Sequence, residues 1–329
     1  MFKVVENSRK PVTRTQVHQL VKLFLLVAFS FILTMACHPL AVQESSVSQV
    51  QSPECRVVQH KLGEVCIPDD PQRIVALEPR YLADPLLALG IKPIGMSIYV
   101  DRGEEKLHGL TPDDIEGIEN LGDLSQPSLE KILRLKPDLI LAMDFHYEKI
   151  YQQLSWIAPT VLVDHQKNNS FKQNLQYIAQ IFDKEAEADQ ILLQYQARIE
   201  ELRNQLNRKP QDIEVTVLFH YGGQFVPGPS SDAFAEVFSD IGLRYDTISD
   251  EFRISLEVLN QYDADILFII NRDREPHSFF LENPIFASLD AVKNNRVYFI
   301  DDAGSWDVKG PIGVNGILDD LFKYLPTVE

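Results

Sequence analysis

A long amphipathic stretch, residues 183–210, constrains the fold of this chain more than any other feature. Its apolar side chains recur every three or four positions, the spacing of one helix face, at Ile191, Tyr195, Ile199, Leu202 and Leu206. We expect Asp183 to cap the start, while the cations Arg208 and Lys209 mark the end and Pro210 stops the helix. At 1.5 Å per residue it would span at least the width of a small domain. Such a helix either belongs to one compact domain or connects two lobes.

The segments on either side of this stretch favour two lobes. Residues 127–142 and 254–269 share one pattern: Ser-Leu-Glu opens a short helix, an apolar pair follows, and an Asp leads an apolar strand. A chance match is the alternative. Strands alternate with helices in both halves, which indicates mainly parallel sheets. The predicted fold class is therefore α/β, with two similar lobes joined by one long backbone helix and a ligand cleft between the lobes.

The first 36 residues have the features of a signal peptide. Basic side chains precede an apolar run at 23–36, which suits a signal-peptide core and is short for a membrane span. The run ends in Ala36-Cys37, and a small residue before Cys resembles the lipobox of bacterial lipoproteins, although Thr34 and Met35 depart from it. We expect lipidation at Cys37 and a lipid-anchored protein in the periplasm or on the outer face of the plasma membrane. The alternative is an ordinary signal peptide with a bystander cysteine.

Two short segments lie between the predicted signal peptide and the predicted lobes. Residues 37–53 are polar and lack periodicity, so we expect a flexible tether. In residues 54–70, Cys55 and Cys66 flank a predicted hairpin. An exported protein meets oxidising conditions, so we expect a disulfide worth roughly 2–3 kcal/mol. The alternative is a metal pair, but His60 is the only further ligand nearby and four are wanted.

Length and charge limit the remaining possibilities. The 329 residues allow two domains with cores of their own, which we place at 71–170 and 211–329, with connecting helices at 171–210. The net charge of −17 argues against nucleic acid or an anionic membrane surface as a partner. Residues 1–36 carry five basic residues and Glu6, a net +4, so the chain without them has a net charge of −21.

The predicted strands place the cleft. In the first lobe they lie at 73–77, 93–99, 138–142 and 160–164, and in the second at 215–219, 265–269 and 296–300, before a last helix at 311–324. In open α/β sheets, ligands bind beyond the carboxyl ends of the strands. Two such lobes that face each other form a cleft there.

Several blocks of this sequence carry a family resemblance: 73–77, 87–95, 127–140, 157–161 and Gly310-Pro-Ile-Gly. From about Pro71 to the end, the chain resembles the iron-siderophore class of periplasmic binding proteins. These are the helical-backbone, or cluster III, solute-binding lipoproteins of ABC importers. The resemblance implies a monomeric receptor without enzymatic activity or cofactor. It would bind an iron(III)-siderophore or similar ferric chelate between its lobes and deliver it to a membrane permease dimer. Family members also carry ferric citrate, haem or vitamin B12.

Two glutamates occupy the same slot of the two repeats. Glu130 and Glu257 each lie in the first turn of a short predicted helix. The resemblance implies that they dock the protein by salt bridges to arginines of a two-fold symmetric permease. Such pairs steer association and fix register more than they add affinity. The alternative is that each glutamate only stabilises a helix N-terminus.

The loops after the strands should line the cleft. Arginine forks suit the oxygens of a ferric chelate, and aromatic rings cover its apolar rim. The candidates are Arg80, Tyr81, Tyr99, Arg102, Phe145 and His146 in the first lobe and His220, Tyr221, Arg253, Asn271, Arg272 and Trp306 in the second. Each has an alternative role as a solvated arginine or a packed side chain. Many relatives have an arginine before the position of Pro127, but residues 122–126 here contain none, which argues against strongly anionic chelates such as catecholates.

Other chemistry has little support in the sequence. There is no Gly-x-Gly-x-x-Gly after a strand, no P-loop, no Gly-x-Ser-x-Gly and no His-Glu-x-x-His. A bare-metal site from His146, His220 and Asp144 would need these side chains to converge across the cleft. An exported α/β enzyme that uses the cleft is the remaining alternative of a different class, and it would need a nucleophile–base pair.

Overall fold

The computed structural model describes residues 55–245, 253–301 and 303–327, all within the compact unit Pro53–Glu329. The predicted signal peptide, the tether and Cys37 lie outside the described residues. In the part that is described, no helix combines the length and the apolar character needed to cross a membrane.

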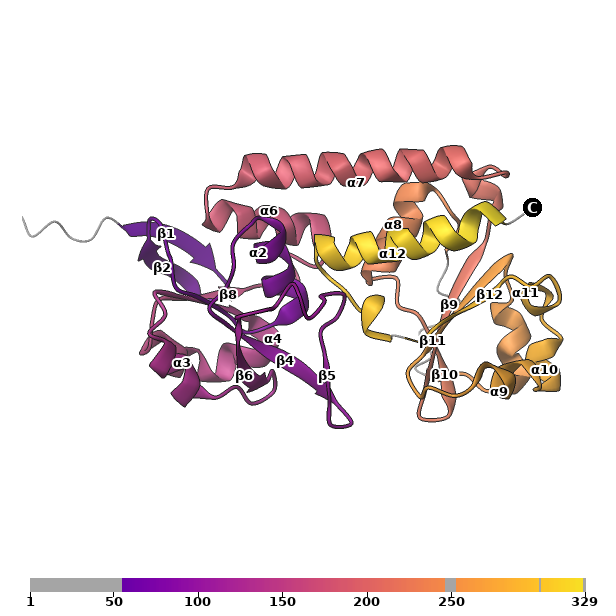
Figure 1. Ribbon diagram of the computed structural model, residues 1–329, viewed down its shortest axis with the longest axis horizontal. Coiled ribbons are helices and arrows are strands. Elements are labelled where there is room, and N and C mark those ends of the chain that lie inside the picture. Colours follow the sequence, from indigo (N-terminus) through magenta and orange to yellow (C-terminus); the bar gives the residue numbers. More distant parts are fainter. Residues whose placement is uncertain (1–54, 246–252, 302, 328–329) are drawn as a thin grey trace, which may run out of the picture. The chain divides into compact units, whose positions relative to one another are not determined.

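The first lobe is built on a six-stranded sheet (Figure 1). Its strands are β3 (Ile74–Ala76), β4 (Gly95–Asp101), β5 (Glu104–Lys106), β6 (Glu119–Asp123), β7 (Leu139–Met143) and β8 (Thr160–Val163). The order is β5-β4-β3-β7-β8, with β6 beside β4, and every pair except β4–β5 is parallel. Strands β3, β7 and β8 are buried along their whole length, as expected where helices cover both faces. The helices are η1 (Pro79–Ala83), α2 (Asp84–Ala88), α3 (Leu129–Leu135), α4 (Asp144–Tyr147), η2 (Glu148–Ile150), α5 (Tyr151–Ser155) and α6 (Phe171–Ile181).

The second lobe has a four-stranded sheet in the order β10-β9-β11-β12. Its strands are β9 (Val215–Tyr221), β10 (Gln224–Pro227), β11 (Ile266–Asn271) and β12 (Val297–Ile300). Its helices are η3 (Pro210–Asp212), α8 (Ala233–Ile241), η4 (Leu256–Tyr262), α9 (His277–Leu281), α10 (Pro284–Ala287), α11 (Asp290–Lys293), η5 (Ala303–Ser305), α12 (Pro311–Tyr324) and η6 (Leu325–Thr327). The sequence did not predict β10: Gly222 and Gly223, at φ 62° and 72°, reverse the chain so that Gln224 pairs with Tyr221.

The two lobes repeat one arrangement. Parallel strands run in the order β3-β7-β8 in the first lobe and β9-β11-β12 in the second. The aspartate that precedes the repeated strand accepts backbone hydrogen bonds in both lobes. Asp138 accepts hydrogen bonds from the backbone N–H groups of Gln72 and Arg73 at 2.8 and 2.9 Å, and Asp265 accepts one from Glu214 at 2.9 Å. Each carboxylate therefore ties its strand to the start of the neighbouring strand. The predicted two-lobed α/β fold is confirmed.

The long helix α7 (Glu185–Gln205) is shorter than predicted at both ends. Its N-cap is Lys184, whereas Asp183 adopts a positive φ of 52° and pairs with Arg56, so Asp183 does not cap the helix. The chain leaves the helix after Gln205, and Arg208 binds Asp265 in the second lobe. At 1.5 Å per residue the helix is about 30 Å long.

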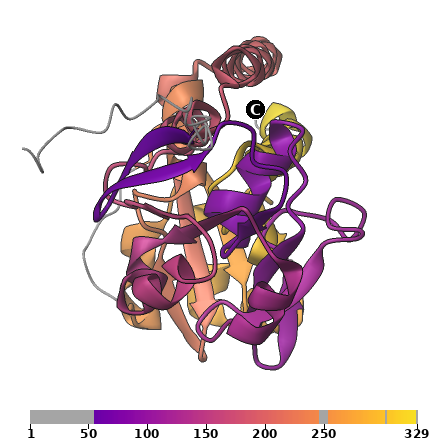
Figure 2. The same ribbon diagram turned by 90° about the vertical axis from the view of Figure 1, so that its left-hand side faces the viewer.

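Helix α7 belongs to both hydrophobic cores. Ala188 and Ile191 pack in the core of the first lobe, whereas Tyr195, Ile199 and Leu202 pack in that of the second. Figure 1 shows α7 running past both lobes, and in Figure 2 it is seen nearly end-on. The predicted connection of two lobes by one helix is therefore confirmed, and its apolar face is what joins them.

Hydrogen bonds to a buried carboxylate also link the two lobes. Asp84 of α2 accepts hydrogen bonds from the backbone N–H groups of Ile312 and Gly313, both at 2.9 Å, and so caps α12. Its side chain is fully buried. Only glycine fits at Gly310, because a Cβ there would lie 2.2 Å from the Asp84 carboxyl carbon. Burial raises the pKa of Asp84 to about 7, although both backbone N–H groups act to lower it.

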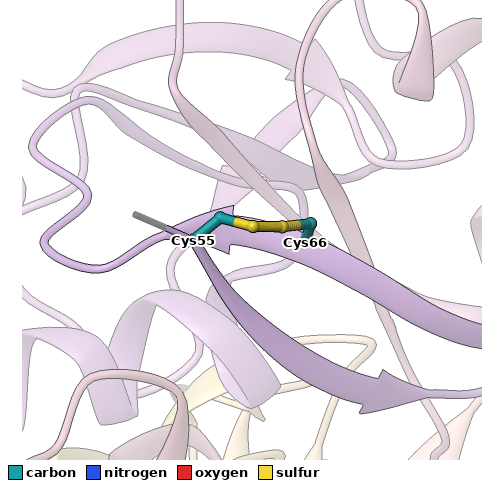
Figure 3. The surroundings of a disulfide bond; sticks show 2 residues. All are labelled: Cys55 and Cys66. Atoms are coloured by element: carbon teal, nitrogen blue, oxygen red, sulfur yellow. A yellow bond between two sulfur atoms is a disulfide. The ribbon is translucent and has the colours of Figure 1, made fainter. Parts of the chain in front are cut away.

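The predicted hairpin at the start of the fold is confirmed. Strands β1 (Cys55–His60) and β2 (Gly63–Pro68) are antiparallel, and a Cys55–Cys66 disulfide with a Cα–Cα distance of 5.6 Å links them (Figure 3). The hairpin lies against the first lobe, where Lys61 N–H donates to the Leu162 carbonyl at 2.9 Å. The disulfide thus links the two strands of a hairpin that packs on the first lobe.

Candidate binding site between the lobes

A cavity opens where side chains from both lobes meet. The first lobe contributes residues from β4, β5 and the following loop, and the second contributes the last residue of β11 and residues after β11 and β12. The lining residues are Tyr99, Asp101, Lys106 and His108, with Asn271, Arg272, Arg274, Asp301, Gly304 and Asp307 opposite. The space inside it that water can enter is about 30 Å³, which is enough to hold water but is narrow for a chelate. A neighbouring hollow of about 150 Å³ is lined only by charged residues, among them Arg102, Glu104 and Asp273.

Asp307 lies at the centre of the buried part of the cleft. Its carboxylate accepts from Arg80 of the first lobe at 2.8 Å and from Arg272 of the second at 3.2 Å. Arg80 Nε also donates a hydrogen bond to the buried carboxylate of Glu78, at 2.8 Å. Burial alone would raise the pKa of Asp307, but the guanidinium groups of Arg80 and Arg272 hold it below the usual range. Two cations from different lobes therefore share one internal carboxylate.

Two ion pairs of opposite polarity cross the outer part of the cleft. In the β4–β5 hairpin of the first lobe, Arg102 donates to Asp273 at 2.7 Å, and Glu104 accepts from both Nη atoms of Arg274 at 2.9 and 2.5 Å. Each lobe thus presents one cation and one anion to the other. Asp273 is also fixed by the backbone N–H groups of the Gly222–Gly223 turn, at 3.1 and 2.8 Å.

Two polar atoms of the cleft have no hydrogen-bond partner within the described residues: His108 Nε2 and Arg272 Nε. Both are buried. His108 Nδ1 lies 3.0 Å from the Asp307 carbonyl oxygen, which only accepts, so Nδ1 carries the proton. Burial lowers the pKa of His108, which favours the neutral ring and leaves Nε2 as an acceptor. The cleft therefore holds one donor and one acceptor that have no partner among the described residues.

The structure brings half of the sequence-predicted site residues to this cleft. Tyr99, Asn271 and Arg272 line the cavity, Arg102 lines the neighbouring hollow, and Arg80 binds Asp307. Tyr221 lies next to them, with its ring 5.3 Å from the Arg102 guanidinium.

The other predicted residues do not line these two hollows. Trp306 is fully buried in the second-lobe core, where its indole N–H donates to Asp320 at 2.8 Å, so it does not face the cleft. Tyr81 is buried against Phe145, and Phe145 and His146 line a separate open hollow. His220 is buried in an aromatic pocket of about 270 Å³, and Arg253 is exposed.

Sequence reasoning missed several residues of the cleft. The sequence predicts no strand between residues 99 and 138, so the β4–β5 hairpin, with Lys106 and the following His108, was missed. The Arg102-Gly103 pair at its turn was the available signal. Asp307 and Arg274 carry no local signal, because only the meeting of the two lobes gives them partners.

The bare-metal alternative gains no support. The predicted partners His146 and His220 line different pockets. Among the described residues, Asp144, Asp164 and His165 could together hold a metal ion. The Lys61 ammonium already lies 3.3 and 3.1 Å from the two carboxylates, so a cation of the protein fills that place.

The two repeat-related glutamates are exposed. Glu130 lies in the first turn of α3, which Ser128 caps, and Glu257 lies in the first turn of η4. A hydrogen bond from the Ser255 hydroxyl lowers the pKa of the Glu257 carboxyl. Both carboxylates are therefore free to meet cations of a partner.

Comparison with known proteins agrees with this geometry. The chain belongs to the family described as Periplasmic binding protein, whose profile matches residues 74–303. It is 30% identical to the probable siderophore-binding lipoprotein YfiY of Bacillus subtilis, over 91% of this chain and 97% of YfiY. It is also 30% identical to the ferric-anguibactin-binding protein FatB of Vibrio anguillarum, over 91% and 95%. The crystal structure of Staphylococcus aureus SirA with staphyloferrin B has a TM-score of 0.68, 26% identity, and coverage of 82% of this chain and 98% of SirA. The resemblance stated from the sequence is confirmed.

Proposed function

We propose that this protein is the substrate-binding component of an ABC importer and holds a ferric siderophore or similar ferric chelate between its lobes. The observation that carries the proposal is the meeting of Arg80 and Arg272, one from each lobe, at the Asp307 carboxylate. Relatives over nearly the whole chain are named for binding siderophores, ferric-anguibactin or Fe(3+)-citrate. The chelate is cargo, and the protein's part is to bind, orient and present it.

The geometry suits this role. A chelate oxygen placed beside the Asp307 carboxylate, between Arg80 and Arg272, would accept hydrogen bonds from guanidinium groups of both lobes. Arg272 Nε is a further donor, with no partner among the described residues. Tyr99 offers a ring at the wall of the same cavity. The lobes would separate only modestly to admit the ligand, because α7 is packed into both cores.

Binding can be tested by titrating the protein from Pro53 onward and following intrinsic fluorescence, corrected for absorption by the ligand. The panel would contain ferric hydroxamates, ferric catecholates, ferric citrate, haem, vitamin B12, the iron-free chelators and zinc. We expect submicromolar binding of at least one ferric chelate. Replacing Arg272→Gln should weaken that binding by about tenfold to a hundredfold, since one charge-assisted hydrogen bond contributes about 1.5–3 kcal/mol.

The matched control is Arg244→Gln, because Arg244 is an exposed second-lobe arginine paired with Glu214 and does not line the cavity. It should bind like the unmodified protein. Binding of zinc alone, or of no ligand in the panel, would refute the proposal. Haem or vitamin B12 as the only ligand would keep the receptor function and change the cargo. The exported-enzyme alternative is not favoured, because the cavity lining contains His108 but no serine, threonine or cysteine for it to activate.

The amino-terminal segment concerns the location of the protein in the cell. We infer that residues 1–36 direct export, that Cys37 is lipidated, and that residues 37–53 tether the fold to the membrane. The relative YfiY is described as a lipoprotein. Replacing Cys37→Ala should release the protein from the membrane fraction into the soluble extracytoplasmic fraction, as judged by fractionation and immunoblotting. The tether variant Ser45→Ala should stay with the membrane, and a membrane-bound Cys37→Ala variant would show that another anchor exists.

A further inference from the structure

The cleft contains as many carboxylates as cations. Its cations are Arg80, Arg102, Lys106, Arg272 and Arg274, and its carboxylates are Asp101, Glu104, Asp273, Asp301 and Asp307. A site built only to attract a strongly anionic ligand would present mostly cations, because like charges in a confined cleft repel the ligand. This balance therefore bears on which ferric chelates fit, and the inference rests on the function proposed above.

The cations are already neutralised in the folded protein. Arg80 and Arg272 share Asp307, Arg102 binds Asp273, and Arg274 binds Glu104. An anionic chelate that binds the arginine N–H groups already in use must displace one of these carboxylates. The displaced group then stays close to the chelate and repels it, because its backbone is part of the cleft.

The central carboxylates are fixed in place. Asp307 follows the fully buried Trp306 and precedes the buried Val308, so its backbone has little room to move. Its own carbonyl holds His108, and the surrounding cations keep its carboxyl ionised at neutral pH. Asp273 accepts from two backbone N–H groups in addition to Arg102. Negative charge is thus a permanent property of the cleft.

The unused acceptor indicates a second requirement. His108 Nε2 is buried, and no described residue donates to it. Asp301, whose side chain is 57% exposed, lines the same cavity and accepts from Asn271 Nδ2 at 3.0 Å. A ligand whose surface carried only acceptor oxygens would leave His108 Nε2 unsatisfied and would meet the negative charge of Asp301. A ligand with an ammonium, amide N–H or hydroxyl group would satisfy them.

We propose that the cleft selects ferric chelates with little or no net negative charge that carry N–H or O–H donors beside their carbonyl-type oxygens. The hydroxamate class with a free amine has these features. The triply negative ferric tris-catecholates lack them. The absence of an arginine at residues 122–126 points the same way.

One chelate in three charge states tests this directly. A linear ferric trihydroxamate with a free terminal amine carries one positive charge; acetylation of the amine removes that charge, and succinylation leaves one negative charge. The iron centre and the length of the chain stay nearly the same. We expect affinity, measured by fluorescence titration, to fall by about tenfold with each step towards negative charge, as unit charges in a partly buried site require. A ferric tris-catecholate should bind most weakly.

Variants then locate the effect in the cleft. Asp101→Asn and Asp301→Asn each remove one negative charge from the cavity lining and should reduce the discrimination between the amine and succinyl forms by about threefold to tenfold. The control Asp189→Asn removes the same charge from the exposed face of α7 and should leave the discrimination unchanged.

Each outcome has a definite meaning. Equal affinities for the three charge states, or tightest binding of the tris-catecholate, would overturn the charge preference and leave the receptor function intact. Discrimination that Asp189→Asn reduces as much as Asp301→Asn would also overturn it, because the effect would then come from overall charge. No binding of any ferric chelate would instead refute the proposed function itself.

Discussion

Replacing Asp84→Ala is expected to lower the free energy of unfolding by about 3–5 kcal/mol, measured by urea unfolding of the protein from Pro53 onward. The substitution would leave the N–H groups of Ile312 and Gly313 unpaired in a place that water does not reach. It would also remove the polar tie between α2 and α12 across the lobe boundary. The large effect follows from losing one group that serves two buried donors.

The cost of this substitution should depend on pH. The folded-state pKa of Asp84, about 7, lies above the unfolded value of about 3.9, so the folded protein holds this proton more tightly. The stabilisation is then fully present below about pH 4 and is lost as the pH rises towards 7. The difference in unfolding free energy between the native protein and Asp84→Ala should therefore be larger near pH 5 than near pH 8.

The exposed Asp70 provides the control, and Asp70→Ala should change stability by no more than about 0.5 kcal/mol. Gly310→Ala should reproduce part of the Asp84→Ala effect, because its Cβ would strike the same carboxyl group. A loss below about 1 kcal/mol for Asp84→Ala would contradict a structural tie at this place.

Changing both Glu130→Ala and Glu257→Ala is expected to reduce uptake of the ferric ligand to the level of cells that lack the protein. Both carboxylates are exposed and occupy equivalent positions in the two lobes, so they match a two-fold symmetric partner. Ligand affinity should stay unchanged, because neither residue lines the interlobe cavity. The measurements are uptake of the radiolabelled iron chelate by cells and fluorescence titration of the purified variant.

A matched double variant separates docking from a general loss of charge. Glu116→Ala with Glu282→Ala removes one exposed carboxylate from each lobe at positions outside the repeat and should leave uptake normal. If the Glu130 and Glu257 variant transports at the normal rate, these residues only stabilise their helices. Equal losses in both double variants would show that overall charge, not position, matters.

The fold could be predicted where local patterns were long or repeated. Helix α12 has the predicted bounds, Pro311–Tyr324, because a Gly-Pro start and a regular apolar spacing mark it. The short helices α9–α11 and the strands β5 and β10 went unpredicted. Each has only three to five residues and depends on the surrounding packing more than on its own sequence.

The site was predictable in part, for a related reason. Arg80, Arg102 and Arg272 reach the cleft because they follow strand ends, which a sequence reveals. Which way a side chain turns there depends on tertiary packing. Trp306 turns into the core, where Phe268 lies 4.8 Å away, ring centre to ring centre, and His220 turns into an aromatic pocket. Asp307 gains its role only from partners supplied by the other lobe.

The sharing of α7 by both cores has a consequence for the transport cycle. Lobes that are packed onto one helix lose little conformational freedom when they bind a ligand, so more of the interaction free energy remains as affinity. We therefore expect release of the iron chelate to require that a partner move the two lobes apart, which would couple release to arrival at the correct membrane complex.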